Sequence, residues 1–347
     1  MGIFKGKKIK KEPKSIIISR TDKIGDLVLS IPTISTVKKM YPKAKLYVMV
    51  RKYNMEVVKG YTFIDGVIPI DDYSKKELYK KLKQIKADIF IALYSNKEVL
   101  KLAFKSGAPY RIGPLSKPLS FFVYNYGIKQ KRSLSIKNEA EYNLDLIKSM
   151  DIELFNKQKI TCDKLQYGRV YHNMALKFLN GNEIYNYILI HPFSGGSTKN
   201  LTVDEYIKVI KKINENKEEQ QIVVTSSLED KERAEYIANN CKNVFVYTAS
   251  SILEIAALID KCKVYVGTST GPSHIAGNLC KKAVCIYPKY KVLSPTRWGL
   301  YGNDKNTTYI IPDKDKDEKN YKDKEFDNIT NEIIEEISSE VVRKLYE

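Results

Sequence analysis

The sequence is poor in residues that bind metals or form disulfides. It has three histidines and five cysteines among 347 residues. The cysteines form no Cys-x-x-Cys pair, and no histidine has a second one at ligand spacing. We therefore expect neither a metal site nor paired disulfides. The cysteines concerned are Cys162, Cys241, Cys262, Cys280 and Cys285.

The sequence also lacks a long apolar run. No stretch is long enough to span a bilayer. Residues 1–15 are basic, but the apolar stretch that follows, 16–18, is far too short for the core of a signal peptide. We therefore expect a cytoplasmic protein.

Acidic residues are scarce relative to basic ones. The chain has 41 Asp and Glu against 59 Lys and Arg, a formal charge of +18 at pH 7. This excess of positive charge favours an anionic partner, which could be nucleic acid, a membrane surface or a phosphorylated substrate. The alternative is a general bias in composition, because the chain is rich in Lys, Ile, Asn and Tyr throughout. No helix-turn-helix, zinc finger or aromatic RNA-binding sheet motif is present, so nucleic acid is not expected as a partner.

A lysine cluster lies close to the first residue, between Lys5 and Lys11. A lysine beside an anionic leaflet gains about 1 kcal/mol. The cluster is therefore either a peripheral contact with the cytoplasmic face of the inner membrane or a solvated tail.

Short apolar runs alternate with helix-length segments along the whole chain. Helices are expected over 26–40, 138–150 and 325–346. Strands are expected over 15–19, 46–50, 67–70 and 89–93, and then over 187–191, 221–225, 244–247, 264–267 and 283–287. Such alternation predicts an α/β fold with two Rossmann-like parallel sheets, divided by a less regular stretch over 151–168.

Ligands of parallel sheets bind beyond the carboxyl ends of the strands, so we expect the functional residues in the loops that follow the strands. The loop after the first strand, 19–26, is neither a Gly-x-Gly-x-x-Gly fingerprint nor a P-loop. It holds two carboxylates four residues apart, Asp22 and Asp26. Asp26 also falls at the predicted helix start, so an ordinary N-cap is the alternative interpretation.

Two later loops contain the small residues and donors that suit a diphosphate. The loop 191–200 has glycines, hydroxyls and Lys199 before a helix, where backbone N–H groups and a cation can converge on an anion. In the loop 267–274, glycines allow close backbone approach and a proline opens the helix. His274 there is either a donor to a phosphate or sugar oxygen or a structural partner.

Four stretches together resemble glycosyltransferase family nine, the family of the ADP-heptose:lipopolysaccharide heptosyltransferases. They are residues 16–42, 188–200, 264–279 and 294–302, and they occur in the family's order. The resemblance implies a GT-B architecture, with two Rossmann-like domains facing across a cleft. The N-terminal domain, 1–165, would bind the acceptor and the C-terminal domain, 166–347, the nucleotide sugar, with the final helix able to pack back toward the first domain.

The resemblance also implies an inverting, metal-independent sugar transfer. Asp26 would be the general base, and Lys23 and Gly25 would contact the acceptor. The donor would be a nucleotide diphosphate sugar such as ADP-heptose, the acceptor a lipid-linked saccharide of lipopolysaccharide type, and no cofactor would be needed. Donor contacts are expected from Ser194, Gly195, Gly196, Ser197, Lys199, Ser269, Thr270, Gly271 and His274, with Asp230 or Glu229 at the ribose.

Two positions depart from the family pattern. Ser269 stands where the family commonly has an acid that grips the donor sugar, and Asn200-Leu201 stands where it tends to have a tryptophan-containing pair. Exchanging a charged acceptor for a hydroxyl weakens a sugar contact by about 1 to 2 kcal/mol. Heptose is therefore one of several donor sugars to consider, and a catalytically inactive module that binds a glycan or nucleotide is the alternative function.

Overall fold

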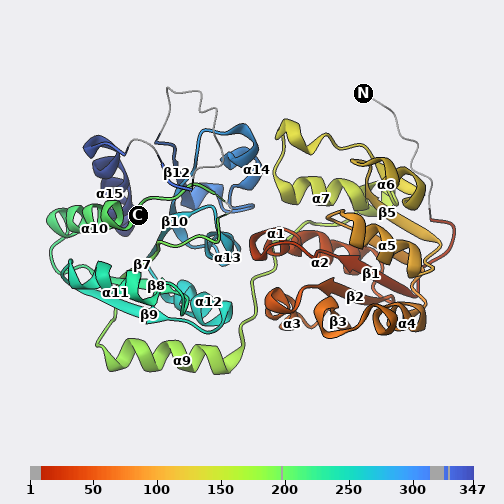
Figure 1. The fold of residues 1–347 in the computed structure, drawn as a ribbon, viewed down its shortest axis with the longest axis horizontal. Helices are drawn as coiled ribbons and strands as arrows, with labels where there is room; N and C mark the ends of the chain where they lie inside the picture. Colours follow the sequence, from red (N-terminus) through yellow and green to blue (C-terminus); the bar gives the residue numbers. More distant parts are fainter. Residues whose placement is uncertain (1–8, 197, 313–323, 327–328) are drawn as a thin grey trace. The chain divides into compact units, whose positions relative to one another are not determined.

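The chain forms two compact units. The computed structural model describes residues 9–196, 198–312, 324–326 and 329–347. The units comprise Met1–Gln166 and Tyr167–Glu347, so the division falls one residue from the predicted 165/166 boundary. Figure 1 colours the first unit red to yellow and the second green to blue. Among the described residues, no helix is both long and apolar enough to cross a bilayer.

The first unit contains a six-stranded parallel sheet with the order β3-β2-β1-β4-β5-β6. Its central strand β1 is buried along its whole length, as expected of a strand covered on both faces. The strands are β1 (Ser15–Ser19), β2 (Lys45–Val50), β3 (Gly66–Pro69), β4 (Ile89–Ala92), β5 (Tyr110–Pro114) and β6 (Tyr126–Ile128).

The second unit repeats this design with the order β12-β11-β10-β7-β8-β9. Read from β9 and counted within its unit, the second sheet has the same order as the first sheet: third, second, first, fourth, fifth, sixth strand. The order reverses between β1 and β4 in one sheet and between β7 and β10 in the other, and ligands bind at such switch points. The strands are β7 (Tyr187–His191), β8 (Gln221–Ser226), β9 (Val244–Thr248), β10 (Val264–Thr268), β11 (Lys282–Ile286) and β12 (Thr307–Ile310).

Helices connect the strands and pack in two groups in each unit. In the first unit α4, α5 and α6 pack together, as do α2, α7 and α8. In the second unit α10 packs with α11 and α15, and α12 with α9 and α13. The helices of the first unit are α1 (Ile24–Val28), α2 (Ile31–Met40), α3 (Glu56–Lys59), α4 (Lys75–Ile85), α5 (Lys97–Lys105), α6 (Pro118–Val123), α7 (Glu139–Lys148) and α8 (Ile152–Asn156). Those of the second are α9 (Gly168–Gly181), α10 (Val203–Asn216), α11 (Lys231–Asn239), α12 (Ile252–Lys261), α13 (Gly271–Asn278), α14 (Pro295–Trp298) and α15 (Asn331–Tyr346).

The α/β prediction with two parallel sheets is confirmed, and two element boundaries are corrected. The single helix expected over 26–40 is two helices, α1 and α2, because Pro32 has no N–H to donate to the preceding turn and instead sits in the first turn of α2. The final helix begins at Asn331 rather than 325, since Glu325 forms a β-bridge with Asn200. Helix α15 packs on α10 and β11 of its own unit.

The cysteines agree with the expectation from their spacing. All five are free thiols, and two of them are fully enclosed in the core of the second unit, Cys262 and Cys285. The lysine cluster lies outside the described residues from Lys5 to Lys8, so its two interpretations stay open.

Candidate active site

A buried arginine organises the loop that follows β1. Arg20 is only 1% exposed, and its guanidinium contacts both carboxylates of the loop. Its Nε lies 2.7 Å from Asp22 Oδ1, and its Nη2 lies 2.5 Å from Asp26 Oδ1. The two acids that the sequence places four residues apart thus share one cation at the switch point of the first sheet.

Further partners of Arg20 come from distant parts of the unit. Its Nη1 lies 3.1 Å from Glu139 Oε1 and 3.2 Å from Asn143 Oδ1, both on α7, and 3.3 Å from the Leu93 carbonyl after β4. Arg132 also forms an ion pair with Glu139. We call Arg20, Asp22, Asp26 and Glu139 the Arg20 cluster. A charge so enclosed is tolerated only when it is paired and hydrogen-bonded, as it is here.

Asp26 lies in the first turn of α1 and does not cap it. The N-cap residue is Lys23, which is exposed and makes no side-chain capping bond. The alternative interpretation of Asp26 as an N-cap is therefore wrong, because its carboxylate turns to Arg20. The neighbouring Gly25 is buried, and its carbonyl accepts the N–H of Leu29 at 2.9 Å.

Burial within the Arg20 cluster raises the pKa of Asp22. Burial raises the pKa of Asp22, the Arg20 charge lowers it and the Asp26 charge raises it, with a result of about 7. Burial lowers the pKa of Arg20, but the three carboxylates outweigh it and hold this pKa above its usual range. The Asp22 carbonyl is fixed as well, since it accepts hydrogen bonds from Tyr53 and Asn54.

We expect the Asp22→Asn substitution to change how stability depends on pH. A carboxyl with a raised folded pKa contributes stability that is fully present below its ordinary pKa of 3.8 and is lost as pH rises through about 7. The unfolding free energy of the wild type should therefore fall relative to Asp22→Asn across this window, by about 1 kcal/mol or more. Urea unfolding at a series of pH values measures this difference.

Asp65 provides a control with the opposite sign. Burial raises its pKa, but hydrogen bonds from the Leu46 N–H and from Lys38 outweigh this, and its pKa is lowered. Relative to Asp65→Asn, the wild type should lose stability as pH falls. Equal pH profiles for wild type and Asp22→Asn would contradict the raised pKa of Asp22.

The loop after β7 is anchored at its end and open at its centre. A Cβ added to Gly195 would meet no atom of the described residues within 4 Å, and Gly196 has a left-handed φ of +75° that favours glycine. Ser194 is half-buried, and the predicted donor residue Ser197 lies outside the described residues. This loop therefore leaves room for a ligand at Gly195.

Lys199 and Asn200 form the anchored end of this loop. Lys199 is 1% exposed, and its Nζ lies 5.8 Å from the centre of the Tyr290 ring. Asn200 donates to the Pro192 carbonyl at 2.7 Å and accepts the Tyr206 hydroxyl at 2.9 Å. The departure from the family pattern at Asn200 thus has a structural role, because its amide closes the loop onto itself.

The loop after β10 lies on the strand next to β7. A Cβ on Gly267 would approach the Tyr265 hydroxyl to 2.6 Å and the His191 carbonyl to 3.1 Å, so only glycine fits between them. Thr270 precedes α13, and its N–H donates to Ser273 Oγ at 3.0 Å. Ser269 and Gly271 are half-buried beside it, and His274 is buried in the first turns of α13.

Of the two acids in the loop after β8, Asp230 is fixed by hydrogen bonds to other described residues, and Glu229 is not positioned in this way. Its Oδ1 accepts from Arg233 Nη1 at 2.9 Å and its Oδ2 lies 3.3 Å from Ser227 Oγ, whereas Glu229 is exposed. Burial lowers the pKa of the nearby His191 to about 4, although the Asp230 charge raises it. His191 is therefore neutral at pH 7.

Sequence reasoning missed the inner part of the Arg20 cluster. Arg20 falls within the loop 19–26, where the sequence pattern assigns no role to it, and the pattern does not single out Glu139 or Asn143. Those two residues lie 119 and 123 positions from Arg20, so no local pattern joins them. The local sequence offers one sign of the cluster: an arginine between a predicted strand and a predicted helix, followed by two acids.

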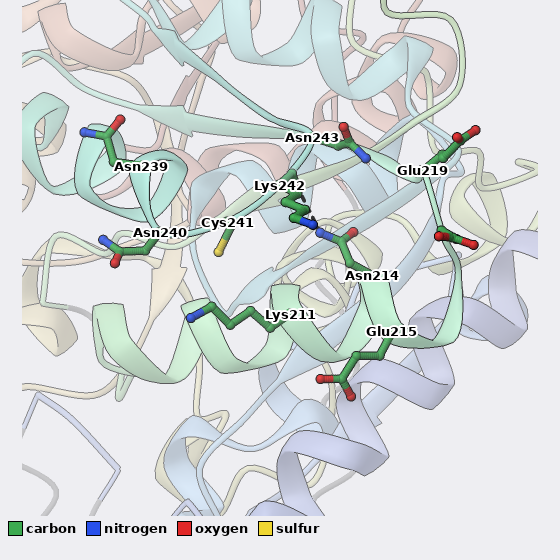
Figure 2. A pocket seen from close by; sticks show the side chains of 10 residues that line it. Lys211, Asn214, Glu215, Glu219, Asn239, Asn240, Cys241, Lys242 and Asn243 are labelled. Carbon is green, nitrogen blue, oxygen red and sulfur yellow. Dashed lines mark hydrogen bonds between the residues drawn. The ribbon is translucent and has the colours of Figure 1, made fainter.

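A surface hollow of about 650 Å³ lies at the opposite edge of the second sheet. Figure 2 shows its wall, where the Asn214 amide donates to the Lys242 carbonyl at 3.0 Å. The hollow lies where α10 and α11 end and β8 and β9 begin, and it contains no predicted donor residue. Among the described residues, no group of three His, Cys, Asp or Glu is placed to hold a metal ion.

The family model described as Glycosyltransferase family 9 (heptosyltransferase) matches residues 76–329. A Haemophilus influenzae protein, provisionally named a glycosyltransferase, is 30% identical over 336 residues, which cover 92% of this chain and 96% of that protein.

Two solved structures share the fold at low identity. Escherichia coli ADP-heptose lps heptosyltransferase II is 18% identical with a TM-score of 0.75, covering 96% of this chain and 98% of that one. Escherichia coli heptosyltransferase WaaC with ADP is 17% identical with a TM-score of 0.61, covering 86% and 93%. The predicted GT-B fold class, with two Rossmann-like parallel-sheet domains, is confirmed.

Proposed function

This chain belongs to glycosyltransferase family 9, the heptosyltransferase family, and from this membership we propose its reaction. It transfers a sugar from a nucleotide diphosphate sugar, with ADP-heptose as the first candidate, to a lipid-linked saccharide of lipopolysaccharide type. The second unit binds the donor and the first binds the acceptor, where Lys23 and Gly25 flank the base. The transfer inverts the anomeric carbon and needs no metal ion.

The position of Asp26 carries this proposal. Its carboxylate lies beyond β1 at the switch point of the first sheet and is held through Oδ1 by Arg20. Its side chain is 13% exposed, whereas that of Arg20 is 1% exposed, so the acid lies on the solvent side of the pair. Oδ2 is then the oxygen that takes the proton of the acceptor hydroxyl.

The chemical step follows from this assignment. The acceptor oxygen attacks the anomeric carbon as Asp26 removes its proton, and the bond between that carbon and the diphosphate oxygen breaks. The nucleoside diphosphate leaves with the bonding electrons. Lys199, with backbone N–H groups of the loops after β7 and β10, stabilises the charge that develops on it. Ser194, Gly195, Gly196 and Ser197 line the diphosphate, as do Ser269, Thr270, Gly271 and His274, while Asp230 binds the ribose.

The neighbouring structures favour ADP as the nucleotide. One is a heptosyltransferase with ADP, and another is described as an ADP-heptose heptosyltransferase. We therefore assign ADP to this chain as the nucleotide of its donor. Ser269 stands in place of an acid, so a donor sugar other than heptose is the alternative.

Calorimetry with ADP, UDP, GDP and CMP, titrated separately in the presence of a chelator, tests the donor assignment. We expect ADP to bind best, with a micromolar Kd, or about 8 kcal/mol. A preference for UDP or GDP would keep the enzyme class and replace heptose by a hexose or an N-acetylhexosamine. If none of the four binds, the donor assignment is wrong and the inactive binding module gains support.

A further inference from the structure

We propose that helix α6 docks the first unit onto an anionic phospholipid bilayer. The docking surface is formed by Leu119, Phe121 and Phe122, which we call the α6 patch. This inference goes beyond the proposed function, since it concerns where the protein sits rather than what it transfers.

The α6 patch is unusually exposed for its chemistry. Phe122 is 85% exposed, Leu119 56% and Phe121 50%, so half of a six-residue helix consists of large apolar side chains in solvent. Single exposed apolar residues are common, but neighbouring ones indicate an interaction surface. Phenylalanine and leucine are also the side chains that interfacial helices insert at the boundary between headgroups and acyl chains.

The exposure is built into the fold, because the other side of α6 is firmly held. Ser120 is buried, and the Tyr124 hydroxyl lies 2.8 Å from Ser95 Oγ. The Tyr124 ring packs so closely on Gly113 of β5 that an added Cβ would approach it to 2.6 Å. Arg111 donates to the Val123 carbonyl at 2.7 Å and so satisfies the end of the helix. Rotation of α6 to bury its phenylalanines would break these contacts.

The charge around α6 points to an anionic surface as the occupant. Between Glu98 and Glu139 the sequence has no acidic residue and eight lysines and arginines. Lys117 adjoins the helix, and the Lys129 ammonium lies 5.5 Å from the centre of the Phe121 ring. Helix α5, which packs on α6, exposes further lysines at its end. The exposed lysines of this region are Lys101, Lys105, Lys117, Lys129 and Lys131.

Exposed apolar side chains with lysines nearby match the chemistry of a bilayer with anionic headgroups. The phenylalanines gain by leaving water, and each lysine gains from the negative surface potential. An acidic protein partner would satisfy the lysines but offers no general counterpart for two adjacent exposed phenylalanines on a short helix. We therefore take the bilayer as the occupant and treat a protein partner, including a second copy, as an outcome of the test.

Vesicle co-sedimentation of the full chain, without sugar nucleotide, tests the proposal. We expect binding to vesicles of equal parts phosphatidylglycerol and phosphatidylcholine, weaker binding at high salt, and little binding to phosphatidylcholine alone. The double variant Phe121→Ser/Phe122→Ser should bind the anionic vesicles about tenfold more weakly. Since both side chains are exposed, its thermal unfolding should match the wild type.

Two further variants show how much vesicle binding depends on the position of the exposed aromatic side chains and how much on the lysines. Tyr185→Ser removes an aromatic side chain of similar exposure, 74%, from the second unit and should leave vesicle binding unchanged. Lys129→Gln/Lys131→Gln should weaken anionic binding by about fivefold per charge and so tests the same surface if the phenylalanine variant misfolds.

The proposal is overturned if both double variants bind vesicles as the wild type does. It is equally overturned if binding depends only on residues 1–8, as a deletion of that segment would reveal. Absence of vesicle binding together with self-association that the phenylalanine variant abolishes would assign the patch to a second copy. None of these outcomes depends on sugar transfer, so they leave the proposed function unaffected.

Discussion

The Asp26→Asn substitution should lower kcat by about 10²- to 10⁴-fold and leave nucleotide affinity nearly unchanged. Asparagine is isosteric and can still accept a hydrogen bond from Arg20, so the loop after β1 should keep its conformation. It cannot take the acceptor proton at neutral pH. The loss should therefore appear in turnover, measured by release of the nucleoside diphosphate in the presence of donor and acceptor.

Asp72→Asn is the matched control for this experiment. Asp72 is also an aspartate of the first unit, but it is exposed, and its Oδ1 pairs with Lys52 Nζ at 3.0 Å. We expect its substitution to leave turnover and stability unchanged. Turnover of Asp26→Asn within a factor of two of the wild type would remove Asp26 from the role of general base. A parallel loss of ADP affinity would point to disruption of the fold instead.

The Arg20→Gln substitution should destabilise the protein by about 3–5 kcal/mol. Arg20 is enclosed with Asp22, Asp26 and Glu139, and its removal leaves these carboxylates without their common cation. Glutamine offers two N–H donors in place of the charged fork and cannot satisfy all three acids. Urea unfolding at pH 7 would measure the loss, which for a domain of this size is a large part of its total stability.

Arg51→Gln tests whether the burial of Arg20 is the cause of the stability loss expected for Arg20→Gln. Arg51 also contacts two carboxylates, Asp71 at 2.8 Å and Glu98 at 2.5 Å, but its side chain is half-buried and both carboxylates are exposed. Its loss should cost about 1 kcal/mol or less. If Arg20→Gln and Arg51→Gln lower the free energy of unfolding by similar amounts, burial of the Arg20 cluster does not increase its contribution to stability.

The pH dependence of Arg20→Gln offers a second readout. Arg20 lowers the pKa of Asp22 against the effect of burial, so loss of the cation raises this pKa further. The contribution of Asp22 to stability is then present at low pH and lost as pH rises. The deficit of the variant relative to the wild type should therefore shrink on acidification. A deficit independent of pH would indicate lost packing of the Arg20 side chain rather than uncompensated charge.

Most strands could be predicted because parallel strands covered on both faces appear as continuous apolar runs. This holds for β1, β7 and β10 within a residue. It fails for β5, which contains Arg111, Gly113 and Pro114, and for β6, which has only three residues. Their pairing with the sheet is a tertiary effect that no local pattern reveals. The break between α1 and α2 coincides with Pro32 in the first turn of α2, whereas the apolar spacing over 26–40 by itself predicts one helix.

The site could be predicted where it follows from strand ends and could not where it depends on distant contacts. Asp26, Lys199 and Thr270 each lie just beyond a strand that the apolar pattern identifies. Glu139 reaches Arg20 only because α7 packs beside α2. The raised pKa of Asp22 likewise depends on burial, which the sequence of the loop does not contain. The exposed phenylalanines of α6 would by composition alone be assigned to a core.

The two sheets share one strand order, and each takes all six of its strands from one continuous half of the chain. Two sets of similar apolar parallel strands, if released together, could pair with the wrong set. Synthesis on the ribosome separates them in time, because residues 1–166 are synthesised before any strand of the second sheet. At about 5–20 residues per second, the remaining half needs on the order of 10 to 40 s. The first sheet thus has time to close its hydrogen bonds before its counterpart is made.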